Sequence, residues 1–478
     1  MKTLYLLLSA LVMTACGTPE ENSVDKNNQN ANEYVATWNS LAKHETPKWL
    51  TDAKFGIYTH WGISTVDYSR NQKDIARPET KDEEISAMKN SLEDFKAEKF
   101  NPKAWAKLFK EAGAKFAGPI SWHGSPYIHW DSDLTPYNSV DMNPHRDIVG
   151  ELQEAIYAEG MKFLMTLHAT QHEDWLNICM DGINKYVPDL LWVDASFGET
   201  KGWRFINRTH FVGEAGMPEE PRALSDADQR TFIANYYNQA LKKGKEVEFT
   251  YKSSDIPPCV GMRDLENGLM DQLYDTPWLT DVDMNICPDW ATHGWFYREG
   301  IPLRDANNII DMLADVVSKN GILLLNVPPK ADGSFPVEVE ETLHKVGAWL
   351  NINGEAIYNT TPWSLFGEGP TVINSNNNKF HHNDHFAQNK FTQKDIRFTV
   401  NGNNIYAICL GTPNDDQLCI KAMSSVLSLR KGDIENVSIL GFTSFETNWC
   451  HDKQGLTVSL PDFENKQFAV VIKVTLSK

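Results

Sequence analysis

Apolar residues recur at helical spacing in several stretches of residues 34–360, and short apolar runs separate these stretches. In residues 102–113, Trp105, Leu108 and Phe109 share one face, which predicts an amphipathic helix. Residues 190–193 form a short apolar run that is typical of a buried strand. Similar patterns predict strands at residues 55–59, 116–121, 161–166, 247–251 and 321–326, and helices at residues 146–159, 176–186, 229–241, 306–318 and 337–351.

This alternation of strands and helices predicts an α/β fold for residues 34–360. Repeated units of this kind are typical of a (β/α)8-type barrel. A doubly wound open sheet has the same local pattern, so periodicity alone leaves both architectures open. The length of 478 residues fits one large domain followed by a smaller one.

Residues 361–478 lack long helical patterns and show short segments of alternating hydrophobicity. Turn residues such as Asn401-Gly402 separate several of these segments. The expected strands are residues 396–400, 404–410, 418–423, 437–440, 456–460 and 468–474. The pattern predicts a C-terminal antiparallel β-sandwich. Residues 381–385 (HHNDH) lie inside it, and we interpret them as a solvated polar loop rather than as a metal site.

The first residues have the character of a processing segment. Lys2 precedes a short apolar run, and small residues follow before Cys16. The run is too short to span a bilayer, so a signal peptide is expected. Cys16 followed by Gly17 resembles a bacterial lipoprotein processing site, which predicts a lipoprotein-type signal peptide over residues 1–16; a plain signal peptide is the alternative.

Residues 17–33 are rich in Asn, Glu, Thr and Ser and are expected to form a flexible tether. The N-terminal pattern therefore predicts an exported protein, lipid-anchored in the periplasm or at the outer membrane of a Gram-negative bacterium. The only membrane contact expected is the anchor at Cys16. No pattern in the sequence indicates an oligomeric state.

Charge and cysteine content exclude some classes of function. The formal net charge of −19 argues against nucleic-acid binding, which needs basic patches. No two cysteines have C-x-x-C spacing, so a zinc site is not expected. Cys409 and Cys419 flank a predicted turn, and an exported protein could pair them in a disulfide.

A barrel places reactive groups at the carboxyl ends of its strands, and three such places carry polar residues. His60-Trp61 follows the first predicted strand, Trp122-His123 follows the second, and Asp194 follows residues 190–193. An Asp there is either a turn or helix cap or a nucleophile held by a buried strand. A His beside a Trp is either packed in the core or in contact with a substrate.

Several stretches, in order along residues 46–478, carry a family resemblance. They are 54–62 (KFGIYTHWG), 105–116 (WAKLFKEAGAKF), 191–194 (LWVD), 316–326 (VVSKNGILLLN), 354–358 (GEAIY) and 395–399 (DIRFT). Together they resemble the α-L-fucosidases of glycoside hydrolase family 29. The resemblance implies a (β/α)8-like barrel with a C-terminal β-sandwich, retaining hydrolysis of terminal α-L-fucose from a glycan or fucan, and no cofactor or metal.

The resemblance also assigns roles. Asp194 falls on the catalytic nucleophile, His60 on a sugar-contacting histidine, and His123 on the first histidine of the family's H-H-D motif. The next two positions of that motif are Gly124 and Ser125, so a hydroxyl contact is missing or is supplied by His168. Three tryptophans in or beside these motifs, Trp61, Trp122 and Trp278, are expected as further substrate contacts.

The general acid/base is expected at Glu266, within residues 264–268 (DLENG), which correspond to a D-Y-E-R-G stretch in one branch of the family. The competing candidates are Asp271, Asp281, Asp283 and His293. Two other functions stay open because Gly124 and Ser125 depart from the motif. One is a fucan-directed or endo-acting hydrolase of related mechanism, and the other is a non-catalytic surface glycan-binding protein.

Overall fold

The computed structural model describes residues 33–69, 81–123, 125–168, 174–194, 225–252, 256–286, 295–372, 391–411, 415–463 and 468–477. Several sequence-based predictions lie outside these residues: the signal peptide, Cys16, nearly all of the tether, Gly124, His293 and residues 381–385. No helix among the described residues is long and apolar enough to cross a membrane.

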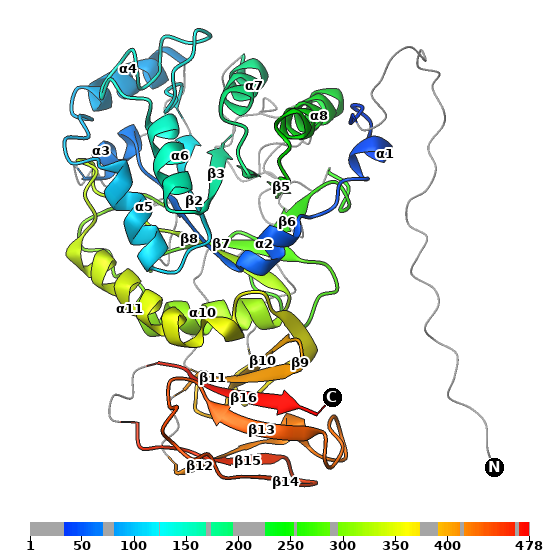
Figure 1. Ribbon diagram of the computed structural model, residues 1–478. Coiled ribbons are helices and arrows are strands. Elements are labelled where there is room, and N and C mark those ends of the chain that lie inside the picture. The colour runs from blue at the N-terminus through cyan, green and yellow to red at the C-terminus, as the bar shows by residue number, and fades with distance from the viewer. Residues whose placement is uncertain are drawn as a thin grey trace.

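Eight parallel strands close into a barrel (Figure 1). They are β1 (Phe55–Thr59), β2 (Phe116–Trp122), β3 (Lys162–Leu167), β4 (Leu190–Val193), β5 (Glu248–Tyr251), β6 (Met262–Asp264), β7 (Trp278–Asp283) and β8 (Gly321–Asn326). The last strand pairs with the first, with Ile57 opposite Leu325. This closure confirms the (β/α)8-type barrel and excludes the open sheet.

Helices lie outside the barrel and precede or follow its strands (Figure 1). They are α1 (Trp38–Leu41), α2 (Lys48–Ala53), α3 (Ile63–Ser69), α4 (Lys81–Leu92), α5 (Pro102–Glu111), α6 (Ile148–Ala158), α7 (Trp175–Tyr186), α8 (Asp226–Lys243), α10 (Ala306–Ser318) and α11 (Val337–Asn353). Polar N-cap side chains start several of them. Asn101 accepts a hydrogen bond from the Ala104 amide, and Pro102 occupies the first turn of α5, where its missing N–H costs nothing.

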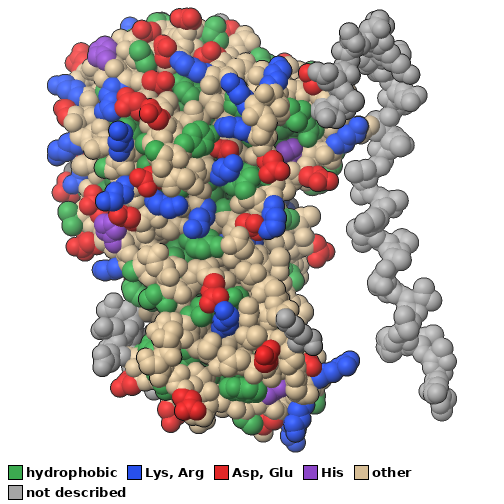
Figure 2. Space-filling model, viewed as in Figure 1, with side chains coloured by type: hydrophobic (Ala, Val, Ile, Leu, Met, Phe, Trp, Pro, Cys, Tyr) green, Lys and Arg blue, Asp and Glu red, His purple; other side chains and the backbone are tan. Residues whose placement is uncertain are grey.

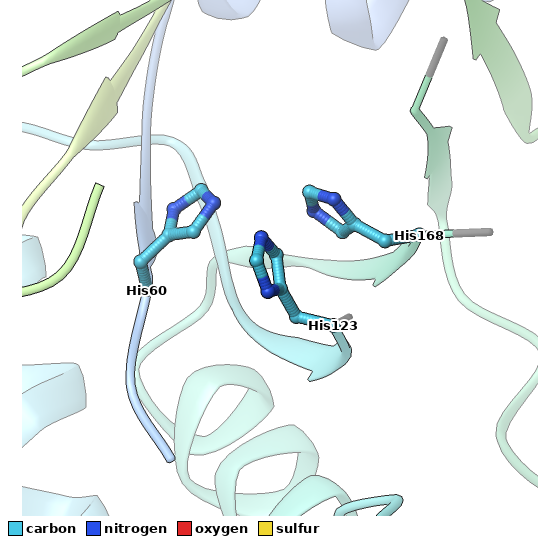
Figure 3. A group of neighbouring side chains, drawn as sticks. All are labelled: His60, His123 and His168. Carbon is cyan, nitrogen blue, oxygen red and sulfur yellow. The ribbon is translucent and has the colours of Figure 1, made fainter. Parts of the chain in front are cut away.

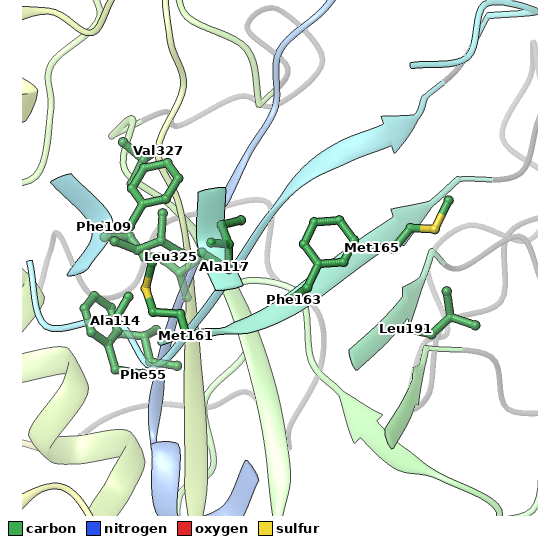
Figure 4. Packing of buried hydrophobic residues seen from close by; sticks show 14 of the residues in the cluster. Phe55, Phe109, Ala114, Ala117, Met161, Phe163, Met165, Leu191, Leu325 and Val327 are labelled. Atoms are coloured by element: carbon green, nitrogen blue, oxygen red, sulfur yellow. The ribbon is translucent and has the colours of Figure 1, made fainter. Parts of the chain in front are cut away.

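The barrel wall separates two apolar layers. Inside the barrel, apolar side chains fill the lumen, and they include Phe116, Leu164, Leu190 and Ile322. Outside, the alternate strand residues pack against the helices, and Figure 4 shows Phe163, Met165 and Leu191 in this layer. A Cβ on Gly118 would lie 1.7 Å from the Leu164 carbonyl oxygen, so only glycine fits between β2 and β3 there.

The C-terminal region forms two antiparallel sheets with the orders β13-β16-β11-β10-β9 and β12-β15-β14. Their strands are β9 (Thr361–Glu368), β10 (Ile396–Asn401), β11 (Asn404–Cys409), β12 (Gln417–Ile420), β13 (Ile434–Ile439), β14 (Trp449–His451), β15 (Leu456–Ser459) and β16 (Val470–Leu476). Helices α10 and α11 lie between the barrel and these sheets (Figure 1). The predicted C-terminal antiparallel β-structure is therefore confirmed.

The predicted disulfide between Cys409 and Cys419 is wrong, because both are free thiols. Cys409 lies on β11 of the five-stranded sheet and is buried, whereas Cys419 lies on β12 of the other sheet and is exposed. The strands β11 and β12 therefore do not pair as a hairpin. On the face shown in Figure 2, acidic and basic side chains are interspersed over the barrel and the sheets.

Candidate active site

The carboxyl end of every barrel strand contributes a polar residue to one rim. These residues are His60 after β1, His123 after β2, His168 after β3, Asp194 after β4, Lys252 after β5, Glu266 after β6, Asp281 and Asp283 at the end of β7, and Asn326 at the end of β8. Side chains two residues apart on a strand share a face. The lumen residues Tyr58, Trp192 and Leu324 therefore set the inward direction of His60, Asp194 and Asn326.

Asp194 is held between two basic groups. Its amide donates to the Leu167 carbonyl, which continues the pairing of β4 with β3 by one residue. One carboxylate oxygen lies 3.3 Å from His168 Nδ1, and the other lies 3.4 Å from Lys252 Nζ. Only 8% of Asp194 is exposed, so the strand and these two neighbours leave the carboxylate little freedom.

Lys252 lies at the centre of four carboxylates. Its Nζ is 2.8 Å from Glu266, 3.2 Å from Asp281, 3.4 Å from Asp194 and 3.6 Å from Asp264. The side chain is 2% exposed and also lies over the Trp192 ring at 4.5 Å. We call these five charged residues the Lys252 cluster. A buried cluster with one cation and four acids cannot keep every carboxyl ionised at low energetic cost.

The electrostatics of the cluster follow from this imbalance. Burial would lower the pKa of Lys252, but the four carboxylates hold it well above its usual value. Burial raises the pKa of Glu266 to about 7; Asp281 and Asp194 add to this, whereas Lys252 opposes it. Burial and Asp281 also raise the pKa of Asp264, although Trp192 Nε1 donates to that carboxylate at 2.8 Å. Glu266 and Asp264 are therefore the proton-holding acids of the cluster.

A tight turn after β6 places Glu266. The Leu265 amide donates to the Leu279 carbonyl, and the Asn267 amide donates to the Asp281 carbonyl, so the turn is bonded to β7 on both sides of Glu266. Asn267 adopts a left-handed conformation (φ 46°), which Asn tolerates better than most residues. The Glu266 side chain is 12% exposed. It is therefore held rigidly in the rim, beside Lys252.

Three histidines from β1, β2 and β3 converge at the same rim (Figure 3). The ring centroids of His123 and His168 are 4.3 Å apart, and His60 lies 5.4 Å from His123. Burial and the other two histidines lower the pKa of His60 well below its usual value, and burial lowers that of His123 to about 3. Both rings are therefore neutral at pH 7.

Asn326 fixes the tautomer of His60. The Asn326 Nδ2 group donates to Asp283 Oδ1 at 2.8 Å, and its Oδ1 accepts from the His60 backbone amide at 2.8 Å. The same Oδ1 is 3.0 Å from His60 Nδ1, which must therefore carry the proton. His60 Nε2 is left with a free lone pair facing the other two histidines. Asp283 is 7% exposed and also accepts from Asn285 Nδ2, and burial raises its pKa to about 7.

The structure corrects the three tryptophan assignments. Trp61 is 1% exposed, donates to the Lys330 carbonyl and packs among Phe95, Phe100 and Trp105. Such an indole is part of the core and cannot meet a substrate.

The other two tryptophans are also structural. Trp122 is fully buried, donates to the Ser125 carbonyl and stacks on Trp175. Trp278 begins β7 at the opposite end of the barrel and donates to the Lys319 carbonyl. Among the described residues, Trp295 is a partly exposed aromatic residue at the rim, and it stacks on His60 with a centroid distance of 5.4 Å.

The candidates for the acid separate by position. Asp271 is exposed, and its neighbour Met270 accepts from Lys319 Nζ, near the amino end of β8. Asp281 accepts from the Tyr58 hydroxyl at 2.9 Å and contacts Lys252, and Asp283 is bonded to Asn326 and Asn285. Glu266 combines a raised pKa with a position beside Asp194, so the geometry favours it.

Lys252, Trp295 and Asn326 were not singled out from the sequence. Lys252 directly follows the predicted strand at residues 247–251, and that position is the signal that could have found it. Asn326 likewise ends a predicted strand. Trp295 follows no periodic pattern, and no signal in the sequence distinguishes it from the other tryptophans.

Comparison with known proteins identifies the family. A family model described as α-L-fucosidase matches residues 22–355, and one described as α-L-fucosidase C-terminal domain matches residues 388–476. The α-L-fucosidase of Branchiostoma floridae is 27% identical over 493 residues, covering 97% of this chain and 96% of that protein. The bovine tissue α-L-fucosidase is 29% identical over 407 residues, covering 77% and 80%.

The fold has relatives among solved structures. The crystal structure of Thermotoga maritima α-fucosidase in complex with fucose superposes with a TM-score of 0.68 at 24% identity, covering 93% of this chain and all of that one. This likeness supports the barrel with its C-terminal sheets. Since the first family model spans well over half of the sequence, the chain belongs to the α-L-fucosidase family of glycoside hydrolases.

Proposed function

We propose that the protein is a retaining exo-α-L-fucosidase, with Asp194 as nucleophile and Glu266 as general acid/base. One observation carries the proposal: Lys252 Nζ lies 3.4 Å from an Asp194 oxygen and 2.8 Å from a Glu266 oxygen. Those two oxygens are therefore at most 6.2 Å apart, the sum of the two distances. Retaining enzymes hold their carboxyls about 5–5.5 Å apart, and inverting enzymes about 6.5–9.5 Å.

The two carboxyls divide the work by protonation state. Asp194 attacks the anomeric carbon and forms a glycosyl ester while Glu266 donates its proton to the leaving oxygen. Glu266, now ionised, then takes a proton from water, and the resulting hydroxide breaks the ester and releases the sugar. The raised pKa of Glu266 suits this double role near neutral pH.

Lys252 positions both carboxyls. Its ammonium is close enough to favour the ionised form of Asp194 and to stabilise Glu266 after the proton has left. It also restrains both side chains: its Nζ approaches Asp194 Oδ1, while His168 approaches Oδ2. The sequence predicted two catalytic carboxyls, Asp194 and Glu266, and the proposal adds one cation, Lys252, that contacts both of them.

The histidines supply the sugar contacts in this proposal. The free lone pair of His60 Nε2 can accept from a sugar hydroxyl, and His123 and His168 offer unpartnered nitrogens within the described residues. His168 lies close to His123 and so can replace the second histidine of the family motif, whose place is taken by Gly124. Partly exposed Trp295 can pack on the apolar face of the sugar.

The test is turnover of an aryl α-L-fucoside by the purified chain, with the anomer of the first product followed by NMR. Retention, together with loss of turnover in Asp194→Ala, would support the proposal. Initial release of the opposite anomer would refute the retaining mechanism. Activity only on internal bonds of a fucan would favour the endo-acting alternative, and binding without turnover would favour a glycan-binding protein.

We also infer export with a lipid anchor at Cys16, because small residues precede that cysteine after a short apolar run. Labelling of cells with a radioactive fatty acid should mark the wild-type protein and leave Cys16→Ala unlabelled. Equal labelling of both proteins would refute the anchor site.

A further inference from the structure

Three imidazoles meet in one place although they come from three separate strands. One ring nitrogen from each of His60, His123 and His168 lies within 4.8 Å of the other two (Figure 3). His60 is 1% exposed, His168 is 7% exposed, and His123 is partly buried. Such a group differs from solvated surface histidines, because the nitrogens face each other rather than water.

Contacts outside the group occupy Nδ1 of His60 and of His168, which leaves their Nε2 atoms for a ligand. Asn326 requires the proton of His60 to lie on Nδ1, which leaves Nε2 as a lone pair. His168 Nδ1 lies 3.3 Å from the Asp194 carboxylate, which leaves Nε2 as the ring atom that can approach a metal ion. Within the described residues, His168 Nε2 and His123 Nδ1 are buried and have no hydrogen-bond partner.

Converging imidazole nitrogens are a ligand set for borderline-soft divalent cations. Zn²⁺ and Co²⁺ prefer imidazole nitrogen, whereas Mg²⁺ and Ca²⁺ require oxygen ligands. Metal-bound histidines usually donate their other N–H to a carboxylate or carbonyl oxygen, and His60 and His168 already have Asn326 and Asp194 in that position. Three histidines with an open fourth position form a known type of zinc site.

We propose that His60, His123 and His168 bind one divalent transition-metal ion of the zinc class, and that the bound ion excludes the sugar. The metal is an inhibitor here and has no part in hydrolysis. Tetrahedral ligation needs nitrogens about 3.3 Å apart, given metal–nitrogen bonds of about 2.0–2.1 Å. Rotation of the imidazoles about their side-chain bonds must supply the difference, and His123 is the least buried of the three.

Metal binding alone tests the site, since it needs no turnover. Titration of the purified chain with Co²⁺ should give the intense visible absorption of a tetrahedral site, saturating at one ion per chain. Zn²⁺ should displace Co²⁺, and Mg²⁺ should not. His123→Ala and His168→Ala should each weaken Zn²⁺ binding at least about 100-fold, since each removes one of three ligands.

Two controls separate this site from other metal ligands. His344→Ala removes an exposed histidine on α11 that pairs with Glu111, and it should leave the titration unchanged. Cys259, Cys419 and Cys450 are exposed thiols, so a variant with all three changed to serine should bind the metal as the wild type does. Zn²⁺ binding that survives in both His123→Ala and His168→Ala would overturn the proposal. So would the absence of binding by the wild type below millimolar Zn²⁺.

The competition with the sugar rests on the proposed function and is tested separately. L-Fucose at saturating concentration should raise the apparent Kd for Zn²⁺ at least about tenfold, and Zn²⁺ should raise KM for the aryl fucoside without lowering kcat. An unchanged Kd in the presence of fucose would overturn the shared site. A chain that binds Zn²⁺ through the histidines but lacks fucosidase activity would refute the proposed function and leave the metal site standing.

Discussion

Two buried ionic groups among the described residues, one in the barrel and one at its junction with the C-terminal sheets, look alike but differ in charge balance. In the Lys252 cluster, one ammonium faces four carboxyls at the carboxyl ends of the strands. At the junction with the C-terminal sheets, one carboxylate, Asp315, lies between Lys319 at 2.8 Å and Arg397 at 2.6 Å. Both lysines are 2% exposed, so burial does not distinguish the two groups.

The difference in balance separates a structural group from a reactive one. At the junction, burial alone would raise the pKa of Asp315, but the two cations hold it below its usual value, so this carboxylate is fixed in one state. In the Lys252 cluster, burial and neighbouring carboxylates raise the pKa of Glu266 to about 7. An excess of acids keeps a proton available, whereas an excess of cations does not.

Loss of the nucleophile should have the largest effect. Asp194→Ala should lower kcat by at least about 1,000-fold, because the covalent route then has no attacking group. Added azide should restore part of the turnover by attacking the anomeric carbon in the space left by the side chain. The control is Asp315→Asn at the junction, which should cost stability but retain activity in the folded fraction. Comparable kcat for Asp194→Ala and the wild type would contradict the assignment.

Glu266→Gln should be the next most damaging change. We expect about 100- to 10,000-fold lower kcat for fucosides with poor leaving groups, and a smaller loss for aryl fucosides, which need less proton donation. The wild type needs Glu266 protonated, so kcat/KM should fall as pH rises through about 7, the pKa that burial produces. The variant should lack this alkaline fall. A wild-type profile that stays flat from pH 6 to 9 would contradict the role of Glu266.

The two lysines allow the comparison to be tested directly. Lys252→Met removes the cation that opposes the raised pKa of Glu266, so the alkaline fall in kcat/KM should move to higher pH while kcat drops about 100-fold. Lys319→Met leaves Asp315 paired with Arg397 and should lower thermal stability without moving the pH profile. If both variants change only stability, Lys252 is structural and the contrast between the two groups fails.

Most of the fold was predictable because the patterns that specify it are local. Runs such as residues 321–326 are wholly apolar and match the strand found there. The strands β6 and β7 were missed for a physical reason: β6 has three residues, and β7 carries Asp281 and Asp283 at inward positions. Because β7 supplies acidic residues to the site, it lacks the apolar pattern that predicts a strand.

The site was predictable only in part. Position after a strand and the family resemblance pointed to Asp194, His60, His123 and Glu266, which the fold brings to one rim. Neither could separate buried tryptophans such as Trp122 from Trp295, because indole burial depends on long-range packing. Lys252 could have been found from its position after a predicted strand, but not its four partners, which come from three other strands and a turn, because no local pattern records such contacts.

The smallest expected effect concerns Asn326, an uncharged residue that orients His60. Asn326 accepts from His60 and donates to Asp283, so Asn326→Ala frees the His60 ring to take either tautomer. We expect KM for the aryl fucoside to rise about tenfold with kcat changed less, which corresponds to roughly 1.4 kcal/mol of lost sugar binding. Asn353→Ala, a buried asparagine at the end of α11, is the matched control and should leave KM unchanged. An equal rise in KM for both variants would mean that Asn326 acts through the stability of the protein. Its hydrogen bond with His60 would then have no part in sugar binding.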